Sequence, residues 1–513
     1  MAEDRNSMKH EAQRGIRVPM MTFTGFLLHV LPSLLFGYVL FVDFIPSAFG
    51  SYADQRLLLS LSLIVLIASG VVWLAFNRTL IASLKGLWPI LPFLFTLFMA
   101  ALQHTSKLYY LVEPVFYTLY FLAFGLIGGI LREANLARES AQAVLLIAII
   151  TSFFYGAMTI TVYLFAMTDN FSRLDHIIPW GFVNIRYWSH VATWLIPLFP
   201  LGILLATWKD NRLWQFGVTF TAAIWWWIVF LSSSRGSMVG LAFGFLLVWV
   251  LFGRAALPWM KLFVRFSVYG LLVWLLLSVL IPSLVFDDLY VRGIKASSSG
   301  RIPLWQEAWA MSLQKFPFGM GPQSWLTHDI LTETYRLSPK FGHPHNMYLM
   351  WAAEYGWISI SGLAVLGGYG LKYLWRRASM VRKRENLEGL WLVGFTVSVT
   401  AALVHAGASA VFIAPGSMLV GLLVLTVFWA LVTPASPKTA PRDAGKGYSR
   451  AAGYLLALVL LVAGGFWFRD VLRYQYAMAA DLEYYQNELS FGHLPRFWFH
   501  GNFPRHPSQM PDN

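Results

Sequence analysis

Thirteen apolar runs, separated by polar stretches, dominate the pattern of this sequence. A transmembrane α-helix needs about 20 predominantly apolar residues to cross the hydrocarbon core of a bilayer, and the runs are close to or above this length. The pattern therefore predicts an all-α polytopic membrane protein with about 12–13 transmembrane helices. The runs lie near residues 20–42, 57–76, 87–102, 108–131, 141–167, 187–206, 213–231, 235–252, 262–284, 346–374, 389–411, 416–433 and 452–468.

The basic residues indicate how these helices are oriented. Lys and Arg concentrate in alternate short loops, most densely in the segment 376–384. Because the cytoplasmic loops of membrane proteins carry an excess of such residues, we assign these loops to the cytoplasm. The polar N-terminus, Met1–Arg17, is then a cytoplasmic tail rather than a cleaved signal peptide.

One loop on the opposite side is much longer than the others. Residues 285–345 form a polar segment of about 60 residues, and loops of this length are usually functional or disordered. Its stretch RIPLWQEAWAMSLQKF has apolar residues at helical spacing, so we expect an amphipathic helix that lies along the membrane surface and covers a cavity. The chain thus divides into N-terminal membrane helices (1–284), this loop, C-terminal membrane helices (346–468) and an outer tail (469–513).

The composition agrees with a membrane protein. Hydrophobic residues make up 57% of the chain and charged residues only 12%, against about a quarter in globular domains. The net charge of +13 could suggest nucleic acid, but the basic residues lie in short loops between apolar runs. We therefore expect membrane lipids as surroundings and no nucleic-acid partner. Cysteine is absent, which excludes disulfides and thiolate chemistry.

The first candidate for chemistry is the motif SSSRGS, Ser232–Ser237, at the outer start of a predicted helix. Ser234 can cap that helix, and Gly236 lets a ligand approach the backbone closely. Arg235 adds a fixed charge to the positive end of the helix dipole, so that the motif would bind an anion. The alternative is an arginine that only reaches from the membrane interface into water.

Two further arginines stand in similar settings. In SSSGRIP, Ser297–Pro303, Arg301 precedes a proline suited to the first turn of a helix. It could bind an anion beside a second helix N-terminus, or be an ordinary solvated loop residue. In WGFVNIRYWSH, Asn184, Arg186 and His190 lie at the outer start of another run and give a weaker signal of the same kind.

Histidines gather where the long loop enters the next run, in GHPHNMYLMWAAEYGW. His345 lies at the expected helix N-terminus, where the dipole disfavours imidazolium and leaves a neutral ring that can accept a proton. Asn346 could hold that ring or bind a ligand hydroxyl, although the pair could also merely cap the helix. His343, in the loop proper, is the alternative base. We expect His405, inside a later run, to be a hydrogen-bonded structural residue.

Several common features are absent. The sequence has no GxxxxGK[ST] loop, so this chain does not use ATP directly. The outer segments contain no Asp/Glu cluster with metal-ligand spacing. We therefore expect no cofactor and no metal.

Three segments resemble the hallmark blocks of the O-antigen ligase/polymerase family. They are SSSRGSMVGL, SGRIPLWQEAWAMSLQKFPFGMGPQSW and HPHNMYLMWAAEYGWIS, all between Ser232 and Ser361. The family has these blocks in this order, with a large periplasmic loop between the second arginine and the histidine. The thirteenth run and the outer tail depart from simple ligases; the tail is similar to that of protein O-oligosaccharyltransferases in the same superfamily.

The resemblance implies a metal-independent, inverting glycosyltransferase of the membrane-embedded GT-C type, in the inner membrane of a Gram-negative bacterium with its site in the periplasm. The donor would be a glycan on undecaprenyl diphosphate, and the expected acceptor is lipid A–core. Arg235 and Arg301 match the arginines held to bind the diphosphate, and His345 matches the histidine held to act at the acceptor hydroxyl. Arg186 resembles a further basic residue near the site.

Other activities remain open at this stage. Within the superfamily, the acceptor could be a second lipid-linked repeat, as for a polymerase, or a protein, as for an O-oligosaccharyltransferase. A polysaccharide transporter or flippase is an alternative of a different class. It would require charged residues at the bilayer midplane on several helices and broken, repeat-related spans, and we find neither in the sequence.

Overall fold

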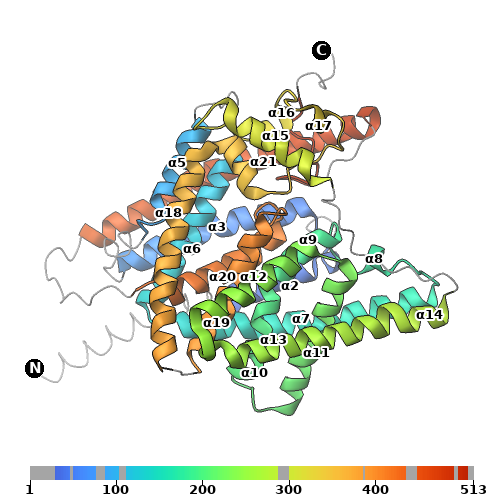
Figure 1. Cartoon of the computed structure of the whole chain (residues 1–513). Helices are drawn as coiled ribbons and strands as arrows, with labels where there is room; N and C mark the ends of the chain where they lie inside the picture. Colours follow the sequence, from blue (N-terminus) through green and yellow to red (C-terminus); the bar gives the residue numbers. More distant parts are fainter. Residues whose placement is uncertain are drawn as a thin grey trace, which may run out of the picture.

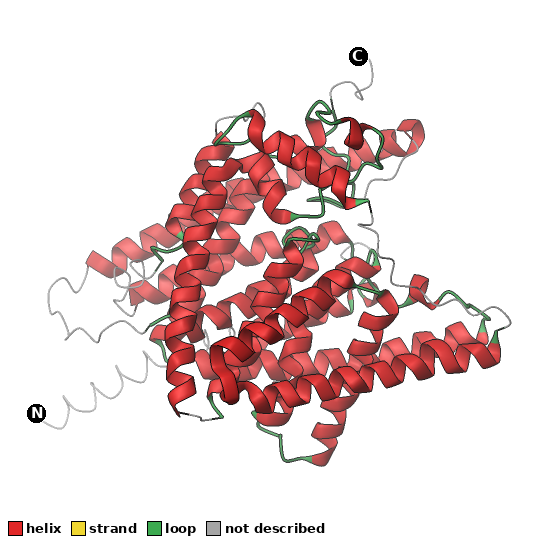
Figure 2. Cartoon of the chain, in the orientation of Figure 1, coloured by secondary structure: helices red, strands yellow, loops and turns green. Residues whose placement is uncertain are grey.

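The computed structural model of the chain describes residues 29–46, 50–76, 87–102, 111–286, 300–384, 387–434, 448–489 and 495–506. Within these ranges the chain forms helices, turns and loops and contains no strand (Figure 2). The predicted all-α fold is therefore confirmed. The proposed cytoplasmic tail Met1–Arg17 and the serines Ser297–Ser299 lie outside the described residues.

The helices follow one another through the whole chain (Figure 1). Those before the long loop are α2 (Leu31–Leu40), η2 (Val42–Phe44), α3 (Tyr52–Phe76), α5 (Leu91–Leu102), α6 (Val112–Glu133), α7 (Ala137–Thr168), α8 (Leu174–Ile177), α9 (Ile185–Leu195), η4 (Ile196–Leu198), α10 (Phe199–Leu204), α11 (Arg212–Ser232), α12 (Arg235–Phe252), η5 (Gly253–Ala256), α13 (Leu257–Trp274), η6 (Leu275–Leu280) and α14 (Ile281–Val285). Those that follow are α15 (Arg301–Gln314), α16 (Ser324–Thr327), α17 (Glu333–Arg336), α18 (Met347–Arg384), α19 (Gly389–Ala406), α20 (Pro415–Val432), α21 (Tyr448–Tyr484) and η7 (Tyr485–Leu489).

The apolar runs coincide with these helices. In the described part of the chain, 10 helical stretches are long and apolar enough to cross a membrane, and α2 and α5 are shorter apolar helices. One stretch, Arg235–Val285, contains two predicted runs, 235–252 and 262–284. They are joined by η5, where Gly253 has a φ of 56° and ends α12. Each of the thirteen runs thus falls on helix, the first through α2 alone.

Helix α20 lies at the centre of the bundle. Its sequence PGSMLVGLLVLTVFWALV is apolar on every side, which is typical of a helix surrounded by protein. It packs against α2, α3, α6, α7, α9 and α19. By contrast, most side chains of the apolar window of α21 are exposed, so that this helix presents an apolar outer surface suited to lipid.

Three glycines determine how α12 packs. Gly236, Gly240 and Gly244 recur at intervals of four residues and face α19, where an added Cβ on Gly240 would overlap the carbonyl group of Ala401. Small residues at this spacing let two helices approach closely. The space above Gly236 holds the ring of His405, rather than the ligand for which the sequence suggested room.

The predicted helix of the long loop is confirmed as α15. Leu304, Ala308 and Met311 are buried in a small apolar cluster that also includes residues of α16, α17 and α18. Of the apolar residues that gave the stretch its helical spacing, Trp309 and Leu313 face outward instead, with 50% and 51% of their surfaces exposed. Figure 1 shows α15, α16 and α17 together over one end of the bundle, which we call the α15 end.

A buried carboxylate shapes the rest of this loop. Glu307 of α15 accepts hydrogen bonds from the backbone N–H groups of Leu331 (2.7 Å) and Thr332 (2.8 Å) and from Nε2 of His328 (2.8 Å). Burial alone would raise the pKa of Glu307, but these hydrogen bonds outweigh burial and lower it. The carboxylate therefore ties residues 328–332 to α15.

A kink in α18 receives the glycine-rich turn that follows α15. Gly356 has a φ of 76° and a ψ of 170°, a conformation that a side chain would strain. The kink frees the carbonyl groups of Ala353 and Glu354, which accept hydrogen bonds from Met320 N (2.8 Å) and Gly321 N (2.9 Å). The long loop is thereby fixed to the start of α18.

The segment that follows residue 468 is helical in its first part. Helix α21 packs along α3 and runs unbroken across residue 469 to Tyr484. Residues 495–506, which we call the C-terminal segment, then return to the bundle, where Phe497 and Trp498 are buried.

Candidate functional site

Three arginines begin helices at the α15 end. Arg186 lies in the first turn of α9, Arg235 is the first residue of α12, and Arg301 is the first residue of α15. The charges of Arg186 and Arg235 both act on Arg301, which indicates that the three arginines lie close together. Burial and then these two charges lower the pKa of Arg301. Like charges gathered at helix N-termini form a favourable site for an anion.

Local structure explains how two of these helices begin. Ser233 adopts a left-handed conformation with a φ of 50°, which ends α11 and lets α12 start at Arg235. Ser234 occupies the N-cap position of α12 but makes no capping hydrogen bond through its side chain, contrary to expectation. Asn184 does cap its helix, because its Oδ1 accepts a hydrogen bond from Arg186 N at 2.9 Å.

His345 lies beside the arginines in a strained and buried position. Its φ is 55°, and only 3% of its surface is exposed. Residues other than glycine rarely hold this backbone conformation, and those that do concentrate at functional sites. Neither ring nitrogen has a hydrogen-bond partner among the described residues. Burial, followed by the charges of Arg186 and Arg301, lowers the pKa of His345 to about 3. The ring is therefore neutral at pH 7, and burial is the largest cause of its low pKa.

The neighbours of His345 have supporting positions. His343 Nδ1 accepts a hydrogen bond from His345 N (3.1 Å), and the two rings lie 4.3 Å apart at 81°. Because Nδ1 of His343 is an acceptor, the neutral ring carries its proton on Nε2. Asn346 caps α18, since its Oδ1 accepts hydrogen bonds from the backbone of Tyr348 and Leu349 at 3.1 Å each. Asn346 therefore acts as a helix cap and makes no hydrogen bond with the His345 ring.

A polar layer lies among the helices that carry this site. His405 shares a hydrogen bond of 3.0 Å between its Nδ1 and Thr193 Oγ1, which agrees with a structural role. His190 Nε2 is hydrogen-bonded to Ser409 Oγ at 2.7 Å, and the two histidine rings lie 5.0 Å apart. Among the described residues, no group of three or more His, Asp and Glu side chains could hold a metal ion.

A buried ion pair that was not predicted from the sequence lies next to the loop that carries His343 and His345. Arg496 of the C-terminal segment contacts Glu354 (2.6 Å) and Glu113 (3.4 Å), and all three side chains are buried. Burial favours the neutral form of Arg496, but the two carboxylates outweigh it and raise the pKa of Arg496 above its ordinary value. Arg496 Nη1 also donates to the carbonyl oxygen of Gly342 (3.2 Å), directly before His343.

Other side chains hold the C-terminal segment in place. Arg56 of α3 donates from Nε to Phe497 O (3.0 Å), and its guanidinium lies 4.4 Å from the centre of the Phe497 ring. The hydroxyl of Tyr52 donates to Arg496 O (2.8 Å), and that of Tyr187 donates to Pro495 O (3.2 Å). The segment is thus a buried part of the bundle next to the site. In the sequence, the only sign of this buried ion pair was the presence of one carboxylate, Glu113 or Glu354, inside each of two apolar runs.

This pairing leads to a first prediction. Arg496→Met should lower the stability of the protein by about 3–5 kcal/mol, because two carboxylates then stay buried without their cation. We expect a lower unfolding temperature in nanodiscs by tryptophan fluorescence. The matched control is Arg473→Met, which removes an exposed pair with Asp470 and should cost less than about 1 kcal/mol. Equal unfolding temperatures for the two variants would contradict the role given to Arg496.

One family model matches part of the chain. Residues 220–364 match the family model described as O-antigen ligase. No curated protein matches the chain. The matched segment extends from α11 into α18 and contains Arg235, Arg301, His343 and His345, whereas Arg186 lies outside it.

Proposed function

We propose that this chain, whose residues 220–364 match the O-antigen ligase family model, transfers a glycan from undecaprenyl diphosphate to an acceptor hydroxyl, with lipid A–core as the acceptor. One observation carries the proposal: Arg186, Arg235 and Arg301 begin three helices close to one another, and the charges of Arg186 and Arg301 act on the buried, neutral ring of His345. Such a site combines a clamp for a diphosphate with a base for a hydroxyl.

The arginines act on the leaving group. As the bond between the anomeric carbon and the diphosphate oxygen breaks, negative charge grows on the lipid diphosphate. The guanidinium groups of Arg235, Arg301 and Arg186 neutralise this charge through paired hydrogen bonds, without a metal ion. Attack from the face opposite the leaving group inverts the configuration of the anomeric carbon.

His345 acts on the acceptor. The oxygen of the acceptor hydroxyl forms a bond to the anomeric carbon. The proton of that hydroxyl moves to a ring nitrogen of His345, which is then an imidazolium. His343 is less suited to this step, because its Nδ1 already accepts the N–H of His345. Two positive charges help keep the pKa of His345 low. A bound diphosphate would cancel those charges, so that His345 becomes a stronger base once the donor is in place.

We further propose that the site faces the periplasm and that the N-terminus is cytoplasmic. The loops that carry Arg186, Arg235, Arg301 and His345 all belong to the side that the basic residues assign to the periplasm. The absence of native cysteine permits a direct test. A cysteine in place of Asp329 should react with a membrane-impermeant maleimide in spheroplasts, and one in place of Lys383 should be protected. The reverse pattern would overturn this orientation.

Deletion of the gene separates the possible acceptors. A ligase mutant should produce lipopolysaccharide without O-antigen chains on a gel, while polymer accumulates on undecaprenyl diphosphate. Capping by a single repeat would instead indicate a polymerase. Normal lipopolysaccharide with loss of protein glycosylation would indicate a protein O-oligosaccharyltransferase.

A further inference from the structure

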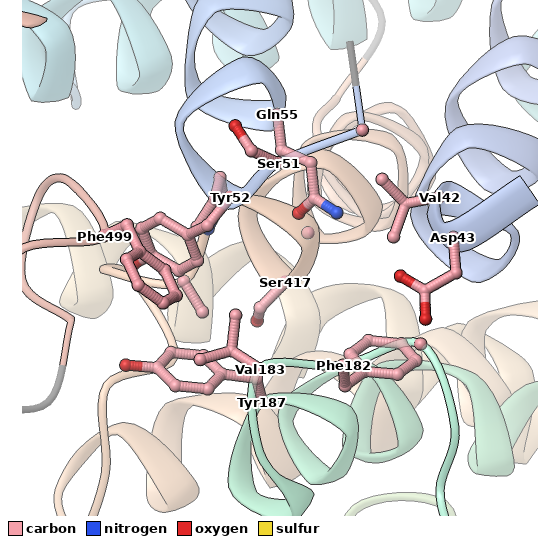
Figure 3. A pocket seen from close by; sticks show the side chains of 15 residues that line it. Val42, Asp43, Ser51, Tyr52, Gln55, Phe182, Val183, Tyr187, Ser417 and Phe499 are labelled. Carbon is pink, nitrogen blue, oxygen red and sulfur yellow. The ribbon is translucent and has the colours of Figure 1, made fainter. Parts of the chain in front are cut away.

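A cavity of about 360 Å³ lies against the first turn of α9, the turn that also carries Arg186 (Figure 3). It is lined by η2, the first turns of α3, α9 and α20, residues 181–183 and the C-terminal segment. Tyr187, which forms part of its wall, directly follows Arg186 in the chain. Its volume is within the range of about 300–1,000 Å³ that is usual for small-molecule sites. Neither the diphosphate clamp nor the base of the proposed reaction uses this space.

The polar groups of the cavity suit a ligand with hydroxyl groups. The Asp43 carboxylate and the Gln55 amide have no hydrogen-bond partner within the described ranges, and both side chains reach the cavity in Figure 3. Ser417 Oγ accepts a hydrogen bond from Trp194 Nε1 (3.1 Å) and keeps its own proton to donate. The cavity therefore offers one charged acceptor, one amide that both donates and accepts, and one hydroxyl donor.

Aromatic rings supply the rest of the wall. Phe182, Tyr187 and Phe499 line the cavity, and the hydroxyl of Tyr187 is engaged with Pro495 O in the C-terminal segment. Tyr187 thus presents its ring rather than its polar end. A sugar ring has apolar C–H faces and hydroxyl groups at its rim, so that aromatic walls with a few polar groups complement it on both counts.

The charge of the cavity excludes a phosphate. Among the residues that the structure describes, no Lys or Arg lines it, and Asp43 would repel an anion. The diphosphate belongs at the arginines, and a neutral sugar ring fits the adjoining cavity. On the premise of the proposed function, we infer that this cavity is a subsite for a neutral sugar ring of one of the two glycan substrates.

The test measures sugar binding apart from transfer. Two oligosaccharides without lipid or phosphate serve as probes, one with the repeat unit of the donor and one with the core structure of the acceptor. Saturation-transfer NMR on the protein in nanodiscs should detect binding of one of them. Its affinity should fall about tenfold or more in the Asp43→Ala/Gln55→Ala double variant, since two hydrogen bonds are lost. Inorganic pyrophosphate should not displace it.

Matched controls separate the cavity from the rest of the surface. Asp169→Ala removes an exposed carboxylate at the end of α7, and Phe316→Ala removes an exposed aromatic ring after α15; neither lines the cavity. Both should bind the oligosaccharide as the wild type does, whereas Phe499→Ala should weaken binding. If neither oligosaccharide binds the wild type, or if the double variant binds as tightly as the wild type, the inference is wrong.

A transfer assay then separates the test of the sugar subsite from the test of the proposed function. In the double variant, KM for the substrate that carries the bound sugar should rise about tenfold, with kcat changed less than about twofold. Transfer with wild-type KM values would contradict the sugar subsite and leave the proposed function intact. Specific sugar binding by a wild-type chain that has no transfer activity would support a sugar site in the cavity and contradict the proposed function.

Discussion

His345→Ala should lower the rate of glycan transfer about 10²–10⁴-fold, the usual effect of losing a general base. The variant should still bind the donor, because the diphosphate contacts the arginines and takes no proton from the ring. The measurement is a single-turnover assay on the reconstituted protein with saturating lipid-linked donor and acceptor. Donor binding is followed separately through protection of the lipid-linked glycan from a soluble pyrophosphatase.

His343→Ala is the matched control for this prediction. His343 has the same ring and the same burial but acts by accepting the backbone N–H of His345 (3.1 Å). Its loss should disturb the position of the base and reduce transfer less than His345→Ala does. If His343→Ala abolishes transfer while His345→Ala is nearly as active as the wild type, His343 is the base. If both variants are active, the reaction needs no base from this loop.

Arg235→Ala and Arg301→Ala should each reduce transfer at least about 10²-fold, since each removes charge stabilisation of the leaving diphosphate. Lysine at either position should restore little activity. An ammonium group carries the charge but lacks the two parallel N–H donors with which a guanidinium holds a phosphate. The assay is the same transfer reaction, with donor concentration varied to separate binding from the chemical step.

Arg138→Ala provides the control for these variants. Arg138 is an exposed arginine in the first turn of α7 that pairs with Glu388, and the basic-residue rule assigns it to the cytoplasmic side. Its removal should leave transfer unchanged. If Arg235→Lys and Arg301→Lys both keep most of the wild-type rate, a diffuse positive field is sufficient and the guanidinium clamp is wrong.

The helices, and the positions of Arg235 and Arg301 at helix starts, were predictable for physical reasons. A bilayer satisfies no backbone hydrogen bonds, so each apolar run long enough to span it has to be helical. The fold of α15 followed from its apolar spacing, although the sequence did not show that Leu304 and Met311, rather than Trp309, face the protein. Charges at the ends of helices are local features of a sequence, which is why Arg235 and Arg301 could be found in it.

The features that were missed depend on contacts between distant parts of the chain. Arg496 and Glu354 are separated by 142 positions, and no local pattern connects them. Gly236 suggested room for a ligand because the side chain that fills this space, His405 of α19, is also remote in sequence and could not be recognised as its partner. The left-handed conformation of His345 could not be foreseen either, because only a small minority of histidines adopt it. Pairing across the bundle decides the first two.

The most direct test of the proposed function is transfer by the purified chain alone. The protein is reconstituted in liposomes with undecaprenyl-diphosphate-linked glycan and lipid A–core, and the products are analysed by gel and mass spectrometry. We predict glycosylated lipid A–core and free undecaprenyl diphosphate in equal amounts, with an inverted anomeric linkage and no loss of activity in a metal chelator. A folded protein that forms no new glycosidic bond with this acceptor, or that only lengthens the lipid-linked glycan, would contradict the assignment as a ligase.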